Sequence, residues 1–181
     1  EVVRRNARSL LGQVDDLLDA SRMELGELEA ELEDVDLAAL IRETAGQFRP
    51  LARRVGTDLA LDAPDRLPAR ADAEKVERAL LNLLSTAFKF TPSGGRVRVR
   101  LRVEPAERGA EGGAATPRTA SGGPPGEGEA RRQVFLEVRD SGPGVAPEDR
   151  ERVFERFHQL DGSSTRAHGG TGLGLSLARE L

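Results

Sequence analysis

The sequence of 181 residues contains no cysteine, tryptophan or tyrosine, and it contains two histidines. The absence of cysteine excludes disulfide frameworks and thiolate metal sites. The two histidines, His158 and His168, lie in a glycine-rich part of the chain and do not form a metal-ligand pair. Aromatic residues make up 3% of the chain, which argues against a surface that stacks nucleic-acid bases.

Long apolar runs and a strong charge of one sign are also missing. No stretch approaches the ~20 apolar residues of a membrane-spanning helix, and no signal peptide is recognisable. Charged residues make up 32% of the chain and the formal net charge is -4, so nothing favours nucleic acid or an anionic membrane as a partner. The length suffices for one domain with a core, plus an extension.

Two glycine-rich segments are the most informative features that are present. Gly169–Gly174 leads into an apolar helical pattern, and Asp140–Gly144 follows an alternating strand pattern. Glycine lets backbone approach a ligand closely, and N–H groups at a helix start bind anions. The first segment lacks the Gly-Lys-Ser/Thr of a P-loop, and no strand pattern precedes it as in a Rossmann turn. By itself it also fits a flexible loop.

A third segment, Asn82–Pro92, belongs to a helix that we expect to begin after Asp72 as N-cap. Asn82, Thr86 and Lys89 are separated by four and three residues, so they share one helix face beside the apolar face. A solvated surface is the alternative interpretation. The neighbouring glycine segments favour a binding surface.

Four segments in this order resemble the conserved boxes of the sensor histidine kinase ATP-binding domain. Asn82–Pro92 resembles the N box, Asp140–Gly144 the first glycine box, Phe154–Phe157 the F box and Gly169–Leu175 the second glycine box. The wider family includes gyrase, MutL and the ninety-kilodalton heat-shock chaperones. The resemblance covers nearly the whole chain. It implies an α/β fold, a two-layer sandwich of helices and a mixed, largely antiparallel sheet, preceded by a bundle helix.

The resemblance also implies two domains. Residues 1–34 would be the second helix and linker of a dimerisation bundle, and residues 35–181 the ATP-binding catalytic domain. An apolar stripe with bundle spacing supports the first, although an amphipathic helix packed on its own domain is the alternative; it comprises Val3, Ala7, Leu10, Val14 and Leu17. Residues 105–131 are rich in Gly, Ala and Pro, which predicts a disordered insertion between two strands.

ATP and Mg²⁺ are the cofactors that the resemblance implies. Asn82 would lie by the phosphates and position Mg²⁺ or the reacting water, Lys89 would contact phosphate oxygens, and Asp140 would accept a hydrogen bond from the adenine amino group. The segment His158–His168 would form a lid. The full predicted nucleotide-binding set is Asn82, Lys89, Asp140, Gly142, Gly144, Gly170, Thr171, Gly172, Leu173, Gly174 and Leu175.

One residue departs from the family pattern. The second N-box Asn, which usually supplies an oxygen to Mg²⁺, is replaced by Thr86, whose hydroxyl is on a shorter arm. Mg²⁺ demands near-octahedral oxygen geometry. Two functions therefore stay open: a histidine kinase, and a nucleotide-binding regulatory module with impaired catalysis. An ATPase of the gyrase or chaperone branch ranks lower, because those branches use a Glu base where this chain has Asn82.

The partners follow from the same resemblance. Both chain ends fall inside apolar helical patterns, so we expect a fragment of a longer protein. The phosphoacceptor His would lie on a first bundle helix ahead of residue 1. We expect a homodimer through the bundle helix, a response regulator or receiver domain as phosphoryl acceptor, no nucleic-acid partner, and a cytoplasmic location with membrane attachment only through parts outside this chain.

Overall fold

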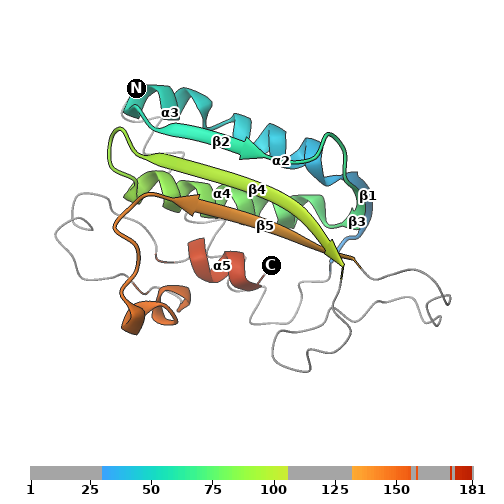
Figure 1. Ribbon diagram of the computed structural model, residues 1–181. Helices are drawn as coiled ribbons and strands as arrows, with labels where there is room; N and C mark the ends of the chain where they lie inside the picture. Colours follow the sequence, from blue (N-terminus) through green and yellow to red (C-terminus); the bar gives the residue numbers. More distant parts are fainter. Residues whose placement is uncertain (1–29, 106–131, 156–157, 159–171, 173, 181) are drawn as a thin grey trace, which may run out of the picture.

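The computed structural model describes residues 30–105, 132–155, 158, 172 and 174–180 (Figure 1). The predicted bundle helix, the insertion apart from Pro105, and most of the lid lie outside the described residues, as do Gly170, Thr171 and Leu173. In chain order the elements are β1 (Glu33–Asp36), α2 (Leu37–Gly46), α3 (Arg49–Val55), β2 (Asp58–Asp62), β3 (Pro68–Ala71), α4 (Ala73–Phe90), β4 (Arg96–Pro105), β5 (Arg132–Asp140), the short 3₁₀ turns η1 (Pro147–Asp149) and η2 (Arg152–Phe154), and α5 (Gly174–Glu180).

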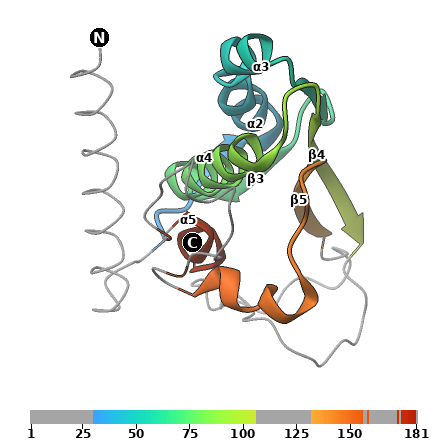
Figure 2. The same ribbon diagram turned by 90° about the vertical axis from the view of Figure 1, so that its left-hand side faces the viewer.

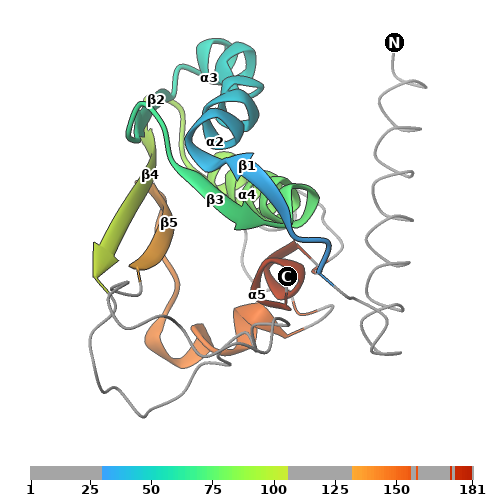
Figure 3. The same ribbon diagram turned by 90° about the vertical axis from the view of Figure 1, so that its right-hand side faces the viewer.

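The strands form two sheets, and helices lie on one side of the larger one (Figures 2 and 3). The larger sheet has the order β2-β4-β5, with β2 parallel to β4 and β4 antiparallel to β5. The parallel pair needs a long crossover, which β3 and α4 supply. Strands β1 and β3 pair antiparallel as a separate sheet. The predicted α/β sandwich with a mixed sheet is confirmed, with its strands divided between two sheets.

Apolar and charged residues alternate along β4, so one face of the strand lies in the core and the other is exposed. Val97, Val99 and Leu101 are buried, whereas Arg96 and Arg98 between and beside them are exposed. These side chains pack in one cluster with residues of α2 and α4. The fully buried residues that the two helices contribute include Ile41, Leu80 and Leu84. Burial of apolar side chains is the main stabilising term, at roughly 1.5–3 kcal/mol per large residue. The sheet therefore holds α4 firmly against one face.

Local sequence signals set most element boundaries. Asp36 and Asp72 cap α2 and α4, Asp72 as predicted, and each accepts hydrogen bonding from amides in the first helical turn. Pro50 stands in the first turn of α3, where its missing N–H costs nothing, so a second helix begins here. That helix ends at Gly56, which has a φ of 71°.

The predicted strand boundaries need correction by one to two residues. The sequence pattern predicts strands over 57–61, 96–103 and 134–139, and the structure has β2 over 58–62, β4 over 96–105 and β5 over 132–140. Pro105 therefore ends a strand instead of beginning the insertion. Strands β1 and β3 were not predicted. Each has four residues, EDVD and PARA, too short and too poor in apolar residues for an alternating pattern.

Candidate functional site

Asn82, Thr86 and Lys89 form a polar stripe along α4. The stripe begins at Asn82, a half-buried residue that faces the start of α5. A Cβ added to Gly174 would lie 3.7 Å from Asn82 Oδ1, so the first residue of α5 packs directly on this side chain. The Asn82 Nδ2 atom is buried and has no hydrogen-bond partner among the described residues. An unsatisfied buried donor costs about 1–3 kcal/mol, so an acceptor on a ligand would stabilise this group.

Thr86 lies one helical turn after Asn82 and is half-buried. Two other threonines, Thr44 within α2 and Thr91 at the C-cap of α4, donate their hydroxyls back to the carbonyls four residues earlier, at 2.9 and 2.7 Å. Within the described residues the Thr86 hydroxyl makes no such bond. This oxygen is therefore available to a ligand beside Asn82.

Lys89 completes the stripe near the C-terminal end of α4. Burial lowers the pKa of its ammonium below the ordinary value of 10.5. Its Nζ also lies 5.1 Å from the centre of the Phe90 ring. Partial burial thus disfavours the charged form, whereas the cation–π contact favours it. Lys89 has no ion pair among the described residues, and a phosphate oxygen would supply a counter-charge.

The glycine segment after β5 presses against the same end of α4. Asp140 is exposed, and its Oδ1 accepts a hydrogen bond of 2.7 Å from the Gly142 amide. A Cβ at Gly142 would lie 2.6 Å from that oxygen and 2.9 Å from the Phe90 carbonyl oxygen, so a larger residue would clash. Gly144 has a φ of 75°, in the left-handed region. The two glycines therefore bring this backbone against α4.

Ser141 fixes the segment from the other side, a role that sequence reasoning missed. Its Oγ accepts a hydrogen bond of 2.8 Å from the Arg96 amide, and its own amide donates to the Arg96 carbonyl at 2.9 Å. Both bonds join the end of β5 to the start of β4. The interaction depends on strand register, so no local signal in the sequence could have revealed it.

The F-box prediction is described only in part. Phe154 ends the turn η2 and is 37% exposed. Its ring centre lies 5.6 Å from the Arg179 guanidinium carbon of α5, whereas Phe157 lies outside the described residues. The contact places η2 against α5, and α5 in turn lies beside α4 (Figure 1).

The structure thus brings several predicted site residues around one side of α4. Asn82, Lys89, Gly142 and Gly174 contact or adjoin this helix, and Asp140 stands next to Gly142 at the end of β5. Gly172 has a φ of 74° just before α5, and Leu175 is half-buried within it.

The site offers few protein ligands for a metal ion. No group of three or more His, Asp or Glu side chains among the described residues could hold a metal ion. A cation at this site would therefore depend on the oxygens of Asn82 and Thr86 and on oxygens of a ligand. None of the described helices combines the length and the apolar character needed to cross a bilayer.

Comparison with known proteins gives consistent matches. The chain is 40% identical over its whole length to hybrid signal transduction histidine kinase D of Dictyostelium discoideum, covering 10% of that protein. It is 38% identical to the sensor histidine kinase TmoS of Ectopseudomonas mendocina, again over its whole length, covering 16% of that protein. The chain therefore spans a small part of the length of these relatives.

A solved structure and a family model agree with these relatives. The crystal structure of full-length ShkA in complex with AMPPNP superimposes with a TM-score of 0.70 at 30% identity, covering 99% of this chain and 32% of that one. The family model described as histidine kinase-, DNA gyrase B- and HSP90-like ATPase matches residues 71–181, which include the α4 stripe and both glycine segments. This chain belongs to that ATPase family.

Proposed function

We propose that this chain is the ATP-binding domain of a two-component sensor histidine kinase that transfers the γ-phosphoryl group of ATP to a histidine outside the chain. The observation that carries the proposal is the meeting of three segments at α4: the stripe from Asn82 to Lys89, the backbone at Gly142, and the start of α5 at Gly174. ShkA, whose structure contains AMPPNP, supports a nucleotide of this type.

Each residue has a role that its surroundings support. One oxygen of Asp140 accepts the Gly142 amide, and Oδ2 has no partner among the described residues, so it can accept the adenine amino group. Lys89 neutralises phosphate charge, and the unpartnered Asn82 amide donates to a phosphate oxygen. Phosphoryl transfer relies on positioning and charge stabilisation, which is what these groups provide.

Mg²⁺ fits the oxygen donors of the site. The Asn82 carbonyl oxygen and the Thr86 hydroxyl would hold the ion, which would neutralise charge on the phosphates. The donors are neutral oxygens, so the ligand phosphates would supply the anionic ones. The second glycine segment, including Gly170, Thr171 and Leu173, would contribute backbone contacts to the same phosphates.

Two measurements test the proposal. Calorimetric titration with ATP and ADP, each with and without Mg²⁺, should show binding of both nucleotides. A longer form that carries the acceptor histidine should form acid-labile phosphohistidine with γ-labelled ATP. Failure of both nucleotides to bind at millimolar concentration would refute the proposal.

The second candidate function is a nucleotide-binding regulatory module that transfers phosphoryl groups slowly, and Thr86 is the observation that favours it. Here nucleotide binds, Mg²⁺ adds little to affinity, and Thr86→Asn restores both Mg²⁺ dependence and transfer. Equal and rapid labelling of wild type and variant would exclude this alternative.

The partners are part of the proposal. The relatives are named as sensor or hybrid signal transduction kinases, which favours a receiver domain or response regulator as the final acceptor. Residues 1–34 would pair with a second copy through the bundle, and residues 35–181 would form the catalytic domain. The working compartment would be the cytoplasm, where ATP is available.

A further inference from the structure

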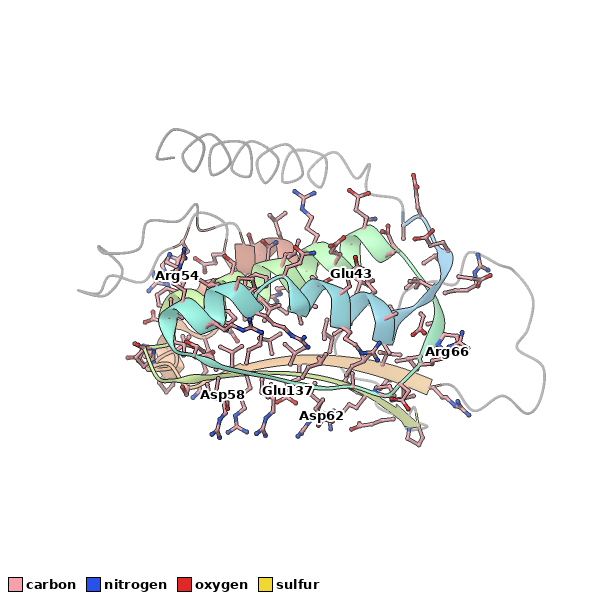
Figure 4. All side chains as sticks on the ribbon, turned by 90° about the horizontal axis from the view of Figure 1, so that it is seen from above. Glu43, Arg54, Asp58, Asp62, Arg66 and Glu137 are labelled. Carbon is pink, nitrogen blue, oxygen red and sulfur yellow. The ribbon has the colours of Figure 1, made fainter. Side chains whose placement is uncertain are left out.

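The face of the β2-β4-β5 sheet that points away from the core carries a patterned set of charges. Figure 4 shows Asp58, Asp62 and Glu137 on the side of the sheet opposite α2. Strand alternation places the arginines of β4 on this side as well, because Val97 and Val99 point into the core. None of the described helices covers this face.

Strand register arranges these side chains in rows across the sheet. In one row Asp58 lies opposite Arg96, with a salt bridge of 3.0 Å. Four residues further along, beyond one intervening row, Asp62 bonds to Arg100 at 2.9 Å, and Glu137 stands opposite Arg100 on its other side. Both rows therefore balance each arginine with at least one carboxylate.

The row between them has no carboxylate. Ala60, Arg98 and Arg139 lie side by side, and the two exposed arginines are direct partners across the antiparallel pair. Neither guanidinium has a hydrogen bond or ion pair among the described residues. Like charges directly opposite each other destabilise a strand pair. A shallow depression opens here, lined by Arg98, Arg100, Glu137 and Arg139.

We propose that Arg98 and Arg139 together bind a carboxylate side chain of a partner protein, presented on an extended segment that lies along this face. The guanidinium fork matches a carboxylate geometrically, and a carboxylate between the two forks removes their repulsion. The surface is separate from the nucleotide site, because outward-pointing Arg139 and inward-pointing Asp140 lie on opposite faces of β5.

The flanking rows select the partner's charge pattern. A polyanion such as nucleic acid would meet the neutral Asp58–Arg96 pair on one side. On the other side it would meet Asp62 and Glu137 around a single arginine, and this excess negative charge would repel it. An extended peptide places alternate side chains about 6.7 Å apart, which matches the spacing of rows. The complementary segment therefore has an acidic residue and, two positions away, a basic residue that faces Asp62 and Glu137.

The test uses the 181-residue chain and the capped peptide Lys-Thr-Glu-Thr-Lys as probe. The Nε–Hε resonances of arginine are followed by NMR during titration at low salt. The control peptide Lys-Thr-Gln-Thr-Lys removes the acidic group and keeps the basic ones. Protein variants are Arg98→Gln, Arg139→Gln and the matched control Arg132→Gln, which removes an exposed arginine at the far end of the same strand.

The Glu peptide should shift the Arg98 and Arg139 resonances, and the Gln peptide should bind about tenfold more weakly, the loss expected for a charge-assisted hydrogen bond. Arg98→Gln and Arg139→Gln should weaken binding similarly, and Arg132→Gln should not. ATP affinity should be equal in all variants, which separates this proposal from the nucleotide site. Absence of a shift, equal binding of both peptides, or tighter binding of a thymidine oligonucleotide or anionic vesicles would overturn it.

Discussion

Individual residues at the site are held in states that cost free energy when no ligand is present. The Asn82 Nδ2 atom is buried and has no partner in the described part of the chain, and the Lys89 ammonium is half-buried with a lowered pKa. Both groups would be stabilised by an anion with several acceptor oxygens. Replacing either side chain with an apolar one should therefore stabilise the nucleotide-free protein and weaken its binding of nucleotide.

Lys89→Met tests this opposition. Burial lowers the pKa of Lys89, so the folded protein holds this proton less tightly than the unfolded chain does. The resulting penalty on the free energy of folding is present at pH 7 and is lost as the pH rises through 10.5. The ligand-free variant should be at least as stable as wild type at pH 7, as measured by thermal unfolding. Its affinity for ATP should fall by about 1.5–3 kcal/mol. A destabilised variant with full ATP affinity would contradict both expectations.

Asp140→Asn tests the adenine contact. Asparagine keeps an oxygen that accepts the Gly142 amide, so the turn should persist, but the charge is lost. Affinity for ATP and ADP should fall alike, by roughly 1.5–3 kcal/mol, because the contact is to the base. Calorimetry gives the comparison. Glu137→Gln, on the opposite face of β5, is the matched control and should leave both affinities unchanged.

At the scale of elements, α4 is the helix on which the site depends, and Asp72 secures its start. The Asp72 carboxylate accepts the Lys75 amide at 3.0 Å and the Glu31 amide at 3.1 Å, and lies 3.4 Å from the Lys75 ammonium. Partial burial acts to raise the pKa of Asp72, but these partners outweigh it and hold the pKa below 3.8. The same carboxylate thus ties the chain before β1 to α4.

Asp72→Ala should destabilise the protein by about 1–2 kcal/mol at pH 7, the usual cost of a lost N-cap. Since the folded-state pKa is lowered, the stabilisation from the charge is present above pH 3.8 and is lost as the pH falls through the lowered value. Asp72→Asn keeps the cap without the charge, so its difference from wild type should shrink at low pH. Urea unfolding at pH 7 and pH 3 measures this. A constant difference would show that the charge contributes nothing.

Arg98 and Arg139 place two positive charges opposite each other in the β4-β5 pair, which should lower the stability of the ligand-free protein. Arg139→Glu replaces a like-charge pair with an opposite-charge one, so the ligand-free protein should gain about 0.2–1 kcal/mol. The gain should decrease in high salt, because both side chains are exposed. Chemical unfolding at two salt concentrations checks this, and a gain that is independent of salt would point to packing as its cause.

At the scale of the whole molecule, one face of the larger sheet builds the core and carries α4, while the other presents the charged rows (Figure 4). The long connection between β4 and β5 joins strand ends that are direct partners, since Pro105 pairs with Arg132. This register would allow a tight hairpin turn in place of residues 106–131.

Replacing residues 106–131 with a short Asn-Gly turn should leave the fold and nucleotide affinity intact. Closing a shorter loop costs less entropy, so stability should rise by about 1–2 kcal/mol. Thermal unfolding and ATP titration of the shortened chain provide the measurement. A large loss of stability would show that the segment packs on the domain.

Local interactions made several features predictable from sequence. Asp36 and Asp72 cap helices because their carboxylates bond to amides two or three residues later, so the signal and the partner lie together in the chain. The single polar face from Asn82 to Lys89 follows from helical spacing alone. Motif order was likewise sufficient to predict the α/β sandwich and the family.

The remaining features depend on contacts between residues far apart in the chain, and only the tertiary structure decided them. Gly142 against the Phe90 carbonyl, Gly174 against Asn82, and Arg98 opposite Arg139 each require one particular packing or register. A shift of one residue between β4 and β5 would turn the outward arginines inward. Strand register is determined by burial of the whole apolar face, which no local pattern contains, so the charged rows could not be read from the sequence.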